Sequence, residues 1–107
     1  KLVFYGATHM LNTFLNINKI KEVDYLIDDD TKKKNKFFSV IKKPIIDFKN
    51  FMKIDENKLA IFISCNLALE KKILAKLKKL KKRPKIYSIF PHSKNYFLNI
   101  KGSWYAN

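Results

Sequence analysis

Four short, mainly apolar segments recur along the chain and predict strands, and the first and third of them are unbroken apolar runs. The four segments occupy residues 2–5, 23–27, 59–63 and 86–90. An unbroken apolar run is typical of a strand that is covered on both faces, as in a parallel sheet, whereas alternation is typical of a half-exposed strand. The chain is therefore predicted to build its core around a sheet buried on both sides.

Between these runs the apolar residues take the spacing of amphipathic helices. One helix is predicted to begin at Thr8, which is a good N-cap. A short helix follows Asp47, and a third spans about residues 67–82 before Pro84 ends it. The apolar stripes consist of Leu11, Phe14 and Leu15, then Phe48, Phe51 and Met52, and finally Leu69, Ile73, Leu77 and Leu80.

Strands that alternate with helices predict βαβ units and right-handed crossovers. We expect an α/β, Rossmann-like three-layer domain over residues 1–91, with a four-stranded, mainly parallel sheet in the order 2-1-3-4. Residues 92–107 are an aromatic-rich extension, which either adds an edge strand or packs on a neighbour. Because the chain opens directly into a strand without an initiating Met, we expect a domain cut from a longer protein.

The net charge of +14 changes this picture little. Of the 23 basic residues only Arg83 is Arg, and a lysine skew of this kind favours a codon preference over a nucleic-acid surface, where Arg is preferred. The lysines of residues 71–85 are predicted to form the solvated face of the third helix, with docking to a membrane surface or a nucleic acid as the alternative. No apolar run is long enough to span a membrane.

The single cysteine, Cys65, excludes an internal disulfide and favours a reducing, cytoplasmic location. It ends an apolar run, so we interpret it as a small buried hydrophobic residue. Without a second cysteine or a Cys/His spacing, no metal site is predicted.

Open α/β sheets bind ligands beyond the carboxyl ends of their strands, where the strand order reverses. The residues that the predicted order delivers to that crevice are Gly6, Ala7, Thr8, Asp28, Asp29, Ser64 and Asn66. Gly6 permits a sharp turn, and the amides after it face an anion at the helix N-terminus. Asp28 follows where such folds place an acid for ribose hydroxyls. Each residue also has a structural interpretation, as an ordinary turn, a solvated loop or a helix cap.

No complete catalytic set is visible, which predicts a ligand-holding module rather than a whole enzyme. The G-x-G-x-x-G fingerprint is absent, since His9 and Leu11 stand where glycines would help a dinucleotide, so hydride transfer is disfavoured. His9 is either an exposed first-turn residue or a base beside the crevice.

Several short segments, in this order and spacing, resemble the C-terminal domain of bacterial sugar C-methyltransferases. They are Gly6-Ala7-Thr8, Asn12-Thr13-Phe14-Leu15-Asn16, Asp24-Tyr25-Leu26-Ile27-Asp28-Asp29, Lys33 with Phe37, Pro44-Ile45 and Ile61-Phe62-Ile63-Ser64-Cys65-Asn66. The resemblance covers about residues 1–91. The chain departs from the family by having Met10-Leu11 in place of Lys-Gly, and Lys42-Lys43 in place of a Gly before Pro44.

The resemblance implies a domain that helps to hold a nucleotide-sugar for a methyltransferase of polysaccharide biosynthesis. In that family a zinc-binding segment and an S-adenosylmethionine-binding domain come before this domain, and neither is present in this chain. The chain is thus expected to hold no cofactor itself and to pack on a catalytic domain or on a second copy.

Two alternatives stay open. Gly-Ala-Thr-His at residues 6–9 and the Asp28-Asp29 pair are also similar to the N-terminal, nucleotide-sugar-binding domain of bacterial sugar acetyltransferases. The other alternative is an interaction domain without a working pocket, which the aromatic residues Trp104 and Tyr105 motivate.

Overall fold

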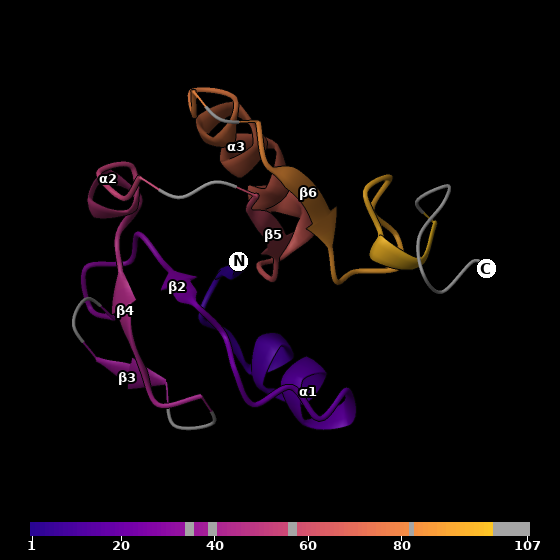
Figure 1. The fold of residues 1–107 in the computed structure, drawn as a ribbon. Helices are drawn as coiled ribbons and strands as arrows, with labels where there is room; N and C mark the ends of the chain where they lie inside the picture. Colours follow the sequence, from indigo (N-terminus) through magenta and orange to yellow (C-terminus); the bar gives the residue numbers. More distant parts are fainter. Residues whose placement is uncertain (34–35, 39–40, 56–57, 82, 100–107) are drawn as a thin grey trace.

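The computed structural model describes residues 1–33, 36–38, 41–55, 58–81 and 83–99. Its elements follow one another along the chain as strands and helices of an α/β domain (Figure 1). They are β1 (Leu2–Tyr5), α1 (His9–Ile17), β2 (Tyr25–Ile27), β3 (Phe37–Phe38), β4 (Lys43–Ile46), α2 (Phe48–Phe51), β5 (Ala60–Ile63), α3 (Leu67–Leu77), β6 (Lys85–Ser88) and the 3-10 helix η1 (Phe97–Asn99).

The sheet has the order β3-β4-β2-β1-β5-β6, in which the strands from β4 to β6 are parallel. The four predicted strands are β2, β1, β5 and β6, and their predicted order is confirmed. The prediction of four strands is short by two, because β4 extends the parallel sheet and β3 pairs with it antiparallel. Strand β3 has only the two residues Phe37 and Phe38, and β4 does not form an unbroken apolar run, since its Lys43 and Pro44 are exposed.

Successive side chains of the strands pack into two separate cores, as a sheet that is covered on both faces requires. Val3 and Tyr5 of β1 join the core beneath α2 and α3, whereas Phe4 joins the core beneath α1. Helix α1 lies on one side of the sheet and α2 and α3 lie on the other (Figure 1). The predicted three-layer arrangement is confirmed.

Each helix begins at a polar side chain that accepts a hydrogen bond from the first turn. Thr8 caps α1, Asp47 caps α2 and Asn66 caps α3, with the acceptor bonded to the amide three residues later in each case. The predicted end of the third helix at about residue 82 is wrong, because α3 ends at Leu77 with Lys78 as its C-cap.

The described part of the C-terminal extension packs against the domain. The Asn95 carbonyl accepts a hydrogen bond from the Ser88 amide at 2.7 Å, and Tyr96 forms a single parallel bridge with Ser88. The ring of Phe97 contacts Phe14 and Phe62 on the α1 face of the sheet. Trp104 and Tyr105, which motivated an interaction with a partner, lie outside the described residues. None of the helices within the described ranges has the length and apolarity to cross a membrane.

Candidate functional site

The carboxyl ends of β1, β2 and β5 lie at one edge of the sheet because the strands are parallel, and Gly6 follows β1 at this edge. Its amide donates to the Ile27 carbonyl at 2.7 Å, and its φ of +122° lies in a region that other residues rarely adopt. A Cβ at Gly6 would stand 2.7 Å from the backbone nitrogen of Cys65. The glycine therefore lets the end of β1 approach the end of β5, rather than leaving room for a ligand at that point.

A cleft of about 330 Å³ opens at this edge, between the loop after β2 and helix α3. Its lining residues are Tyr5, Gly6, Thr8, Asp28, Asp29, Asp30, Lys33, Cys65, Leu69, Lys72, Ile73 and Lys76. Four of the seven residues predicted from the sequence line the cleft, namely Gly6, Thr8, Asp28 and Asp29. Ala7 contributes backbone groups beside it, whereas Ser64 and Asn66 do not line it.

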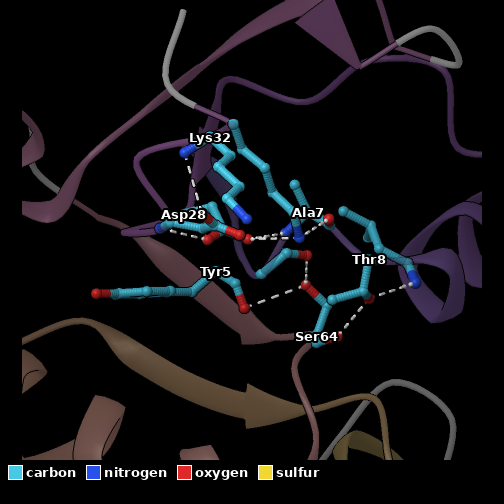
Figure 2. A network of polar contacts seen from close by, with 10 residues as sticks. Tyr5, Ala7, Thr8, Asp28, Lys32 and Ser64 are labelled. Atoms are coloured by element: carbon cyan, nitrogen blue, oxygen red, sulfur yellow. Dashed lines mark hydrogen bonds and ion pairs between the residues drawn. The ribbon is translucent and has the colours of Figure 1, made fainter. Parts of the chain in front are cut away.

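The Asp28 carboxylate is bound into the turn between β1 and α1 (Figure 2). Its Oδ2 accepts from the Ala7 amide at 2.9 Å and from Lys33 Nζ at 3.4 Å, and its Oδ1 accepts from the Asp30 amide at 2.9 Å. Lys33 also donates to the Ala7 carbonyl at 2.8 Å. The first amide after the glycine, which was expected to face an anion, is thus already satisfied by an anionic side chain of the protein.

Asp29 connects three elements at the other side of the cleft. Its Oδ1 accepts from the Phe48 amide at the start of α2, at 2.9 Å. Its Oδ2 accepts from the hydroxyl of Tyr5 on β1 and from Lys76 Nζ on α3, the latter at 2.7 Å. The Tyr5 ring stacks on Phe48, which holds the hydroxyl in place.

These contacts shift the pKa values of Asp29 and Tyr5. Burial alone would raise the pKa of Asp29, but hydrogen bonds from Lys76, Tyr5 and the Phe48 amide outweigh it, so the pKa lies below the ordinary 3.8. Burial, then the hydrogen bond to Asp29, raises the pKa of Tyr5 far above its ordinary value of 10.0. At neutral pH, Asp29 is therefore a carboxylate and Tyr5 a neutral donor to it.

Ser64 and Asn66 hold the framework together. The fully buried Ser64 hydroxyl bonds the Tyr5 and Gly6 carbonyls at 3.2 and 2.6 Å, and Figure 2 shows it directed to that backbone. Thr8 donates to the Ser64 carbonyl at 2.8 Å while it caps α1. Asn66 caps α3. Their predicted contact with a ligand stays a prediction, and each has a structural partner.

Sequence reasoning missed the contribution of helix α3 to the cleft. Leu69, Lys72, Ile73 and Lys76 all line it, and their spacing places them on one face of the helix. The prediction of a solvated lysine face holds at Lys72, which is exposed although it borders the cleft, and needs correction at Lys76, which is paired with Asp29. The four-residue spacing from Leu69 to Ile73 is visible in the sequence. Such a spacing shows which residues share a helix face, but it does not show that this face borders a cleft.

Two other residues discussed from the sequence are Cys65 and His9. Cys65 is buried in the core, as predicted, and burial raises the pKa of its thiol from 9.0 to about 11, which keeps it protonated at neutral pH. His9 is the exposed first residue of α1 and does not line the cleft. Across the described ranges, no three His, Cys, Asp or Glu side chains lie together as a metal site would require.

The chemistry of the cleft is that of binding. A carboxylate has about four acceptor positions, and the Oδ1 atoms of Asp28 and Asp29 each have a single recorded donor, so each retains capacity for a ligand hydroxyl. Leu69 and Ile73 give an apolar wall on the α3 side. Acceptors that face an apolar wall fit a ligand with hydroxyl groups and a flat or apolar face.

A family model described as a C-methyltransferase C-terminal domain matches residues 1–91. No match was found among curated proteins or among solved structures. The match agrees with the first of the two resemblances seen in the sequence and not with the acetyltransferase.

Proposed function

Because the chain belongs to the family of C-methyltransferase C-terminal domains, we propose that it binds the nucleotide-sugar substrate of a sugar methyltransferase and holds it for a catalytic partner domain. The partner is the part that would bind S-adenosylmethionine and supply the methyl group. This chain's own contribution is to orient the substrate.

The observation that supports this proposal best is the placement of two acidic side chains beside an apolar wall at the carboxyl edge of the sheet. Asp28 and Asp29 follow β2 directly and line the cleft with open acceptor positions. This is the edge at which sheets of this type bind ligands. Leu69 and Ile73 close the other side of the cleft with apolar surface against which a base or sugar ring packs.

Calorimetric titration of the chain with dTDP-glucose and UDP-glucose tests the proposal. We expect measurable heat with at least one of them, and at least about tenfold weaker binding for Asp28→Asn, because a charge-assisted acceptor is lost. Asp24→Asn is the matched control. Asp24 also accepts a backbone amide, from Leu2, and it does not line the cleft. An absence of heat with every nucleotide-sugar would refute the proposal.

A second candidate function is that of an interaction domain, which the exposed apolar residues at the same edge favour. Met10 in the first turn of α1 and Leu67 and Leu69 in the first turn of α3 are 51%, 42% and 45% exposed. If Met10→Ser and Leu67→Ser together abolish co-purification with a methyltransferase domain while nucleotide-sugars give no heat, docking and not ligand binding is the function.

A further inference from the structure

The glycine turn of this domain is not where the anionic part of a ligand can bind. The Asp28 carboxylate accepts the Ala7 amide and its side chain is only 15% exposed, so a negative charge already occupies the position that a phosphate would take. A diphosphate at this turn would have to displace that carboxylate or lie against it, and two like charges at contact repel.

The cations at the cleft differ in whether they are already paired. Lys33 is bound to Asp28 and to the Ala7 carbonyl, and Lys76 is bound to Asp29 at 2.7 Å. Lys72 also lines the cleft and is exposed, and no side-chain hydrogen bond or ion pair joins it to any described residue. Of the lining lysines, Lys72 alone thus has all its donors available without breaking a contact of the fold.

We infer that Lys72 on α3 is the phosphate-binding residue of the cleft, so that a nucleoside diphosphate sugar binds with its diphosphate toward α3 and its hydroxyl-bearing part toward Asp28 and Asp29. This assignment rests on the proposed function. In this orientation the diphosphate lies toward α3, whereas the sequence predicts an anion at the glycine turn. Lys76 borders the same wall and screens the diphosphate from Asp29.

The test compares Lys72→Ala with Lys71→Ala in the full chain, by calorimetry with dTDP-glucose, UDP-glucose, thymidine and uridine. Lys71 is the matched control, since it is an exposed lysine of the same helix that does not line the cleft. We expect Lys72→Ala to weaken binding of the diphosphates about tenfold and to leave nucleoside binding unchanged, with Lys72→Arg restoring most of the affinity. Lys71→Ala is expected to bind each ligand like the unmodified chain.

The outcomes separate this assignment from the proposed function. If the unmodified chain binds dTDP-glucose and Lys72→Ala binds it equally well, the assignment to Lys72 is overturned while the proposed function stands. Equal losses in the Lys71→Ala and Lys72→Ala variants would also overturn it, because they would indicate attraction by net charge alone. If the unmodified chain binds none of the diphosphates, the proposed function itself fails.

Discussion

Gly6 is the residue whose identity the fold demands most strictly. It combines a φ of +122° with a close approach to the backbone of Cys65, so both its conformation and its lack of a side chain are used. The sequence indicates a turn at Gly6, since a glycine ends an apolar run. It does not indicate that the close neighbour is the protein's own backbone, because β5 lies more than fifty positions away in the chain.

We expect Gly6→Ala to lower the free energy of unfolding by at least about 2 kcal/mol. The new Cβ would meet the Cys65 nitrogen at 2.7 Å, and a backbone atom in the sheet cannot move aside as a flexible side chain can. Urea unfolding measured by circular dichroism gives the value.

Lys19 provides a control for which the expected change in stability has the opposite sign. It follows the C-cap of α1 with a φ of 54°, a conformation that glycine adopts without strain. Lys19→Gly is therefore expected to stabilise the domain slightly, by about 0.5 kcal/mol. A Gly6→Ala variant as stable as the unmodified chain would show that the end of β1 can separate from β5.

At the scale of elements, Asp29 joins β1, α2 and α3 through a single carboxylate. Because the pKa of this carboxyl lies below 3.8 in the folded chain, its contribution to stability is present above pH 3.8. That contribution is lost as the pH falls through the folded-state pKa.

We expect Tyr5→Phe, which removes one donor to Asp29, to cost about 1–2 kcal/mol near pH 6. The difference from the unmodified chain should shrink as the pH falls below 3.8 and through the lowered pKa of Asp29, and urea titrations over a series of acidic pH values measure it. Tyr87→Phe on β6 is the control, with an expected cost below about 0.5 kcal/mol at every pH value. A Tyr5→Phe cost independent of pH would exclude the bond to the Asp29 carboxylate as its source.

The elements themselves were predictable where local signals agree. The runs that became β1 and β5, and the caps Thr8 and Asp47, are visible in the sequence because each combines an apolar pattern with a distinct boundary residue. Strands β3 and β4 were not, because β3 has only two residues, Lys43 and Pro44 interrupt the apolar pattern of β4, and only pairing with β2 makes β4 a strand.

The candidate site was predictable only in part for a related reason. Asp28 and Asp29 follow an apolar run and so were expected at the crevice, as found. Tyr5 belongs to the apolar run of residues 2–5 and is therefore predicted to be a core residue, although its hydroxyl also donates to Asp29 at the cleft. Lys72 is predicted only to be solvated. Its position beside the cleft could not be predicted, because it depends on how α3 docks against the sheet.

At the scale of the whole molecule, the family match and the packing end at different residues. The match ends at residue 91, which is also where the sequence places the end of the Rossmann-like domain, a division that stays a prediction. The packed structure continues past it: the Ser93 hydroxyl donates to the Glu70 carboxylate of α3 at 2.7 Å, and Phe97 contacts the rings of Phe14 and Phe62. These contacts join α3 through Ser93 and the α1 face of the sheet through Phe97, and both residues lie beyond the matched range.

If residues 92–99 belong to the same cooperative unit, Phe97→Ala should lower the free energy of unfolding by about 1–3 kcal/mol, because it removes an aromatic ring that packs on Phe14 and Phe62 of the domain. Lys94→Ala, an exposed neighbour, should change it by less than about 0.5 kcal/mol. A chain shortened to residues 1–91 should lose at least as much stability as Phe97→Ala and still unfold in one transition, since the sheet remains complete up to β6. Equal stability of the shortened and full chains would instead mean that the extension is a separate unit resting on the domain. Its aromatic residues would then contribute nothing to the fold and would be free to contact a partner.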